Sequence, residues 1–173
     1  MPPAWLFDAF AALMLAVSAV SVARLATARV DGVDNEVAYG LTGVAMAGML
    51  VPDLVTLQSA AWEAIFGVLT AWFLWRFTRE SPRNASLVSS HSAMHAIHSG
   101  AMVYLFAAVT TSGMLEYPAL ALAFASVFIC YAAWDLMKLV GQCRTRGSAA
   151  SATAAGCRIA VSVTMAFMMF VMT

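Results

Sequence analysis

The sequence predicts an all-α fold, a polytopic bundle of transmembrane helices with six spans and no extramembrane domain. Two observations lead to this fold class. Hydrophobic residues make up 62% of the 173 residues and charged residues only 10%, whereas soluble domains are typically about 45–50% apolar and roughly 25% charged. The apolar residues also fall into six runs, and six spans of about 20 residues each use most of the chain. We therefore expect one transmembrane domain over residues 1–173.

Charged and turn-forming residues separate the six runs from one another. The second run is the weakest, because Pro52 and Asp53 interrupt it and proline ends or kinks a helix. A bundle of five spans is therefore the alternative. The expected spans are about 4–26, 37–57, 60–77, 87–110, 117–140 and 154–172.

The distribution of basic residues predicts the orientation of the six spans. All nine lie on alternate loops or at the span ends beside them, and cytoplasmic loops are the ones enriched in Lys and Arg. We expect a multi-pass protein of the plasma membrane with both termini outside. The N-terminal run lacks a preceding basic segment, so it is expected to be a span and not a signal peptide. The basic residues are Arg24, Arg29, Arg76, Arg79, Arg83, Lys138, Arg144, Arg146 and Arg158.

The composition also limits the classes of partner. No basic tail or arginine-rich patch suggests nucleic acid, and three cysteines do not make a disulfide framework. The expected partners are the lipid bilayer, a second copy of the chain, or other membrane subunits.

All three histidines lie in the fourth run. At about 100° per helical residue, His91, His95, His98 and Met102 fall within roughly 60° of one another on one helix face. Ionisable side chains inside a membrane are costly, so such a stripe predicts a functional site. One straight helix cannot offer all three imidazoles to one ion, because they span about 10 Å along its axis.

Methionine is the second unusual feature, with twelve residues in the chain. Thioether and imidazole ligands together suit copper as Cu(I), and neutral ligands add no buried charge. Methionine is also an ordinary core residue, and histidines can bond between helices or relay protons without a metal. The candidate metal ligands are His91, His95, His98, Met46, Met49, Met94 and Met102.

Asp135 is the carboxylate expected nearest to the histidines. If the fourth and fifth spans form an antiparallel hairpin, Asp135 lies level with His91 and His95, and His98 lies level with Tyr131. Asp135 then either orients one imidazole ligand by a hydrogen bond or pairs with Lys138 at i,i+3. Both interpretations remain open from the sequence.

Four functions are consistent with these patterns. The first is a non-enzymatic copper-binding membrane protein, and the second is a b-type haem protein with a histidine and Met46 or Met49 as axial ligands. The others are a proton-coupled carrier and an accessory or structural subunit of a membrane complex. The chain lacks the H-E-x-x-H and G-x-S-x-G motifs, so we do not expect an enzyme.

Two segments resemble a known family. The segment MAGMLVP at Met46–Pro52, together with MHAIHSGAMVYL at Met94–Leu105, resembles a family of small actinobacterial multi-span membrane proteins classed as a domain of unknown function. The resemblance implies an integral membrane protein over nearly the whole chain. It implies no catalytic residue.

Overall fold

The computed structural model describes residues 3–27, 33–51, 54, 58–79, 91–108, 117–144 and 149–173. All regular structure within these ranges is helical, which confirms the predicted all-α class, and each helix covers most of one predicted run. The second helix ends before the predicted residue 57, and Pro52 and Asp53 lie outside the described residues. The six helices are α1 (Ala4–Thr27), α2 (Val33–Leu50), α3 (Ser59–Arg79), α4 (His91–Ala108), α5 (Pro118–Arg144) and α6 (Ala149–Val171).

Three of the helices in the described ranges are long and apolar enough to cross a membrane. The apolar segments are Ala4–Thr27 in α1, Pro118–Gly141 in α5 and Ala152–Val171 in α6. The other three helices carry more polar residues: α2 begins with acidic residues, α3 contains Glu63 and Arg76, and α4 contains the histidines.

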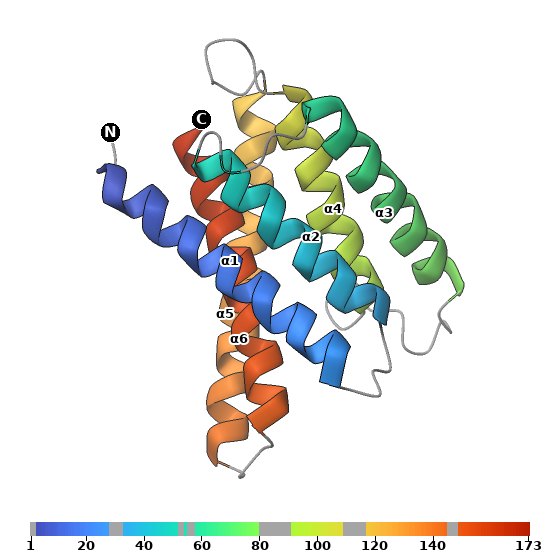
Figure 1. The fold of residues 1–173 in the computed structure, drawn as a ribbon, viewed down its shortest axis with the longest axis vertical. Helices are drawn as coiled ribbons and strands as arrows, with labels where there is room; N and C mark the ends of the chain where they lie inside the picture. Colours follow the sequence, from blue (N-terminus) through green and yellow to red (C-terminus); the bar gives the residue numbers. More distant parts are fainter. Residues whose placement is uncertain are drawn as a thin grey trace.

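The helices pair in the order of the chain. The closest backbone packing joins α1 with α2, α3 with α4, and α5 with α6. Figure 1 shows these three hairpins, with α1 crossing in front of α5 and α6. The expected hairpin of α4 with α5 is therefore not among the closest pairs. These two helices meet through side chains, because Tyr104 donates a hydrogen bond of 2.8 Å to the carbonyl of Tyr117. The helix packed closest to α4 is therefore α3, and the helix packed closest to α5 is α6.

Small residues bring α1 and α2 close together. The Ser18 hydroxyl shares its hydrogen between the carbonyl oxygens of Gly40, at 3.0 Å, and Met14, at 3.1 Å. A Cβ atom on Gly43 would lie 2.6 Å from the Met14 carbonyl oxygen. The two backbones can approach this closely only because Gly43 has no side chain.

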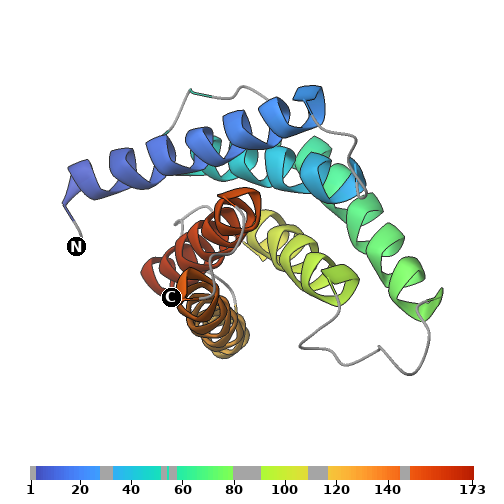
Figure 2. The same ribbon diagram turned by 90° about the horizontal axis from the view of Figure 1, so that it is seen from below.

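Contacts at both ends of α6 establish the direction of α1. Near the start of α1, the rings of Phe7 and Phe10 lie 5.8 and 4.5 Å from that of Phe167. Near its end, Arg24 lies within electrostatic range of Cys157. Helix α1 is therefore antiparallel to α6, which is itself antiparallel to α5, as Figures 1 and 2 show. Consequently α1 and α5 run in the same direction.

The two ends of the bundle differ in charge. The ends of α1, α3 and α5 and the starts of α2, α4 and α6 lie at one end, which we call the basic end. Apolar residues are exposed along the sides of the bundle, and methionines fill much of its interior. The basic end holds the described residues Arg24, Arg76, Arg79, Lys138 and Arg158.

Candidate functional site

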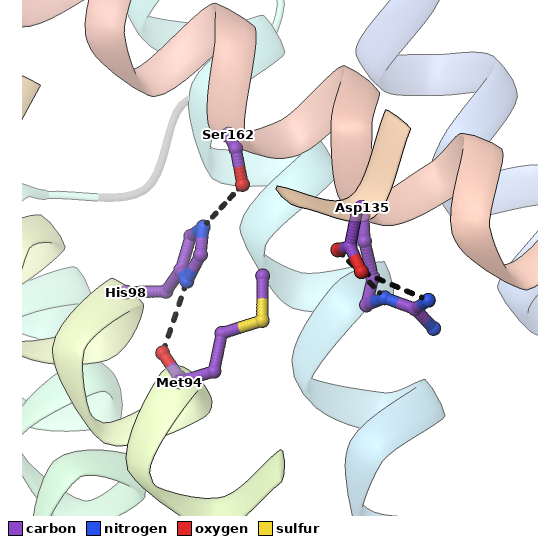
Figure 3. Close-up of polar contacts among 5 residues, drawn as sticks. Met94, His98, Asp135 and Ser162 are labelled. Atoms are coloured by element: carbon purple, nitrogen blue, oxygen red, sulfur yellow. Dashed lines mark hydrogen bonds and ion pairs between the residues drawn. The ribbon is translucent and has the colours of Figure 1, made fainter. Parts of the chain in front are cut away.

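His98 is a buried histidine with a polar partner at each ring nitrogen. Its side chain is 4% exposed. Its Nδ1 lies 3.0 Å from the carbonyl oxygen of Met94, and its Nε2 lies 3.3 Å from the hydroxyl of Ser162 (Figure 3). A carbonyl oxygen only accepts, so Nδ1 carries the proton and Nε2 accepts a hydrogen bond from Ser162. The lone pair of Nε2 is therefore directed at α6.

The surroundings of His98 are apolar and rich in sulfur. The Phe128 ring of α5 lies 4.6 Å from the imidazole, one turn from the Tyr131 level that the sequence predicts. The Met94 side chain extends beside the imidazole toward α6 (Figure 3). Met102 follows His98 by one turn on the same face of α4 and is fully buried. Methionines therefore flank His98 on both sides along α4.

The facing surface of α6 has the same character. Ser162 and Met165, three residues apart on one helix face, are both fully buried. We give the name His/Met seam to Met94, His98 and Met102 of α4 together with Ser162 and Met165 of α6, which the His98–Ser162 contact connects. The seam offers one imidazole lone pair, one hydroxyl and three thioethers, all from buried residues.

The ring of His95 faces different helices from that of His98. It packs 4.8 Å from the ring of Phe73 on α3 and 4.7 Å from the ring of Tyr39 on α2. The two predicted imidazole ligands therefore contact different helices: His95 lies against α2 and α3, and His98 lies against α5 and α6. The third predicted imidazole ligand, His91, begins α4, but its side chain lies outside the described residues.

Asp135 has a different partner from the two that the sequence predicts. Its carboxylate accepts hydrogen bonds of 2.9 Å from Nε and 3.3 Å from Nη2 of Arg158 on α6. The Lys138 ammonium instead lies 5.2 Å from the centre of the Trp134 ring. The guanidinium group matches a carboxylate bidentately, and α6 is the helix packed directly on α5. One signal was present in the sequence, because Arg158 falls inside an apolar run and a buried charge needs a partner.

A second buried ion pair was missed from the sequence. Arg24 of α1 lies 3.0 Å from the carboxylate of Glu36 on α2, and the Glu36 side chain is 8% exposed. Both ion pairs lie at the basic end, and Tyr39 is within electrostatic range of Glu36, Asp135 and Arg158. The sequence did not identify the partners in either pair, because the two members of each pair come from different helices. Each of these two pairs is formally neutral.

The remaining candidate ligands lie on α2. Met46 is fully buried in the same core cluster as Met102. Met49 is half-buried and lines a cavity of about 360 Å³ at the end opposite the basic end. Among the described residues, no group of three or more His, Cys, Asp or Glu side chains is placed to hold a metal ion.

The fold and the seam define an all-helical protein in which a buried imidazole lies among thioethers. The chain belongs to the family described as Domain of unknown function (DUF5134), whose sequence model matches residues 31–172. This match confirms the predicted resemblance to a domain of unknown function, while the actinobacterial origin and the multi-span nature of the family stay predictions. No curated protein and no solved structure matches the chain.

Proposed function

We propose that this protein crosses the plasma membrane six times and binds a soft monovalent metal ion, Cu(I), at the His/Met seam. Its role is then to hold or hand on copper within the membrane. The observation that carries the proposal is the His98 ring, whose Nδ1–H bonds to the Met94 carbonyl while its Nε2 lone pair points into the seam. A backbone carbonyl behind one ring nitrogen is a common support for an imidazole that binds a metal through the other.

The directions of the helices support six crossings. Helices α1 and α5 run in the same direction, so the chain between them must return across the bundle. The intervening helices α2, α3 and α4 provide that return as three consecutive passes. Their polar residues lie mainly at the basic end or against other helices, where a transmembrane helix tolerates them.

The chemistry of the seam supports copper. Imidazole nitrogen and thioether sulfur are ligands that suit Cu(I). They are also neutral, so the ion adds a single positive charge to an apolar interior. His98 Nε2 would bind the ion together with thioethers such as those of Met94 and Met102. The Ser162 hydroxyl must then turn away from Nε2, and the cost is about one hydrogen bond.

The test is anaerobic competition for Cu(I) between the detergent-purified protein and a chromophoric chelator. We expect stoichiometric binding by the wild-type protein and its loss in His98→Ala. Ser162→Ala is the matched control, because it leaves the Nε2 lone pair in place. This variant should bind copper about 3- to 10-fold more tightly, the equivalent of one net hydrogen bond. Copper binding that is undetectable in the wild type, or unchanged in His98→Ala, would overturn the proposal.

A further inference from the structure

A cavity opens at the end of the bundle opposite the basic end. Its volume is about 360 Å³, and it is lined by residues of α2, α3 and α4 and by the residue that follows α6. Met49, Phe106 and Met172 are half-buried and Ser59 is exposed, so the cavity is reached from outside. The lining residues are Met49, Ser59, Leu105, Phe106 and Met172.

The cavity lies on the continuation of the His/Met seam. On α4, the cavity residue Leu105 follows Met102 by three residues, and both are fully buried. On α6, Met168 and Met169 are buried between Met165 and the cavity residue Met172. At 1.5 Å per residue, Ser162 and Met172 are about 15 Å apart along the axis. Thioethers therefore recur along α6 from the cavity to the level of His98.

We propose that this cavity is a second binding site for a soft monovalent cation, formed by the thioethers of Met49 and Met172, through which such ions enter the seam. The destination of the ions depends on the proposed function, whereas binding in the cavity does not. The two sulfurs come from α2 and from the residue that follows α6, so they can approach one ion from two directions. Because both ligands are neutral, the ion can also leave them for the interior.

The aromatic wall of the cavity suits a cation as well. The Phe106 ring lies 6.2 Å from the rings of both Trp62 and Phe66, nearly parallel to each. This stack fixes the position of Phe106 at the cavity. A ring face held in place attracts a cation electrostatically. The Ser59 hydroxyl adds an oxygen at the exposed side.

The experiment uses silver(I), a soft monovalent ion without redox chemistry, and protein carrying ¹³C in its methionine methyl groups. Two-dimensional methyl spectra of the micelle-bound full chain are recorded during silver titration, and Met49→Leu and Met172→Leu assign the two signals. We expect these two signals to shift at the lowest silver concentrations. We also expect the double variant to lose at least about tenfold in affinity for the first silver ion. Leucine has a similar volume, so the variants should fold.

Met137 is the internal control, because its thioether lies exposed on α5. If the Met137 signal shifts at the same silver concentration as that of Met172, binding reflects mere exposure and the inference is wrong. Absence of any shift at Met49 and Met172 also overturns it. In His98→Ala, the cavity signals should still respond while those of Met94 and Met102 do not. If silver shifts the signals of Met49 and Met172 but never those of Met94 and Met102 in the wild-type protein, the proposed function is refuted. Cation binding in the cavity would still stand.

Discussion

The polar side chains in the bundle interior form hydrogen bonds with specific partners. Among the described residues, every buried side-chain nitrogen or oxygen has a hydrogen-bond partner. Ser18 bonds to the backbone of α2 and Ser162 bonds to His98. Such contacts fix the rotation of each helix, because turning it would leave a polar atom unpaired in an apolar interior. A ligand entering the seam must therefore replace an existing partner.

Gly43→Ala should destabilise the protein. The added methyl group would lie 2.6 Å from the Met14 carbonyl oxygen, and a backbone atom cannot move aside without separating α1 from α2. Overpacking of this kind costs about 1–3 kcal/mol. The detergent-purified variant is heated to a series of temperatures, and size-exclusion chromatography measures the fraction that stays folded. The midpoint temperature of unfolding should be lower than in the wild type.

Gly67→Ala is the matched control for this prediction. A Cβ atom at Gly67 on α3 has no heavy atom of another residue within 4 Å beyond its own local helix backbone. Alanine favours helix over glycine by about 1 kcal/mol, so the midpoint should stay or rise. If the unfolding midpoint fell equally in both variants, the close α1–α2 contact would not be the cause of the destabilisation.

At the scale of elements, three ion pairs among the described residues connect neighbouring helices. Two of them lie within a hairpin, and the third connects two hairpins. Asp135 and Arg158 join α5 to α6, Arg24 and Glu36 join α1 to α2, and Arg76 bonds across from α3 to Asp34 of α2. Each pair lies at the basic end. Together they set the register of neighbouring helices at that end of the bundle.

Arg158→Ala should leave the Asp135 carboxylate buried without its partner. Removing one member of a buried pair costs about 3 kcal/mol or more. We expect a loss at the lower end of this range, because the Arg158 side chain is 18% exposed and therefore partly solvated. The thermal midpoint of the variant should fall, and the double variant Arg158→Met with Asp135→Leu should recover most of the loss. A double variant as unstable as the single one would show that the packing, and not the unpaired charge, is responsible.

The helices themselves could be predicted from the sequence, but their rotations could not. Apolar runs between charged residues located all six helices to within a few residues, apart from the early end of α2. Hydrophobicity on all sides of a helix does not indicate which side meets which neighbour. For this reason the sequence could not show that His95 faces Tyr39 while His98 faces Ser162. The buried ring positions were predictable, whereas their partners depend on three-dimensional packing.

For the whole molecule, the directions of the helices support the six proposed crossings, which apolarity alone does not. The described residues include three helices apolar enough to cross a membrane by themselves. In the proposed six-span arrangement, the other three helices are shielded by neighbours over part of their surface and so need a lower apolar content. If α1 and α5 both cross the membrane, their parallel course requires an odd number of crossings between them. Helices α2, α3 and α4 satisfy that requirement.

Reporter fusions can separate six crossings from three. With six, a C-terminal fusion at Thr173 lies outside, and a fusion truncated after Arg144 lies in the cytoplasm. If only α1, α5 and α6 crossed, starting from an outside N-terminus, both locations would be reversed. We therefore expect active alkaline phosphatase and dark green fluorescent protein at Thr173, with the opposite pattern at Arg144. A fusion truncated after Thr27 fixes the starting orientation, because it lies in the cytoplasm only if the N-terminus is outside. If that fusion is cytoplasmic, the reversed pattern would show that α2, α3 and α4 do not cross, and His98 would then not lie inside the membrane.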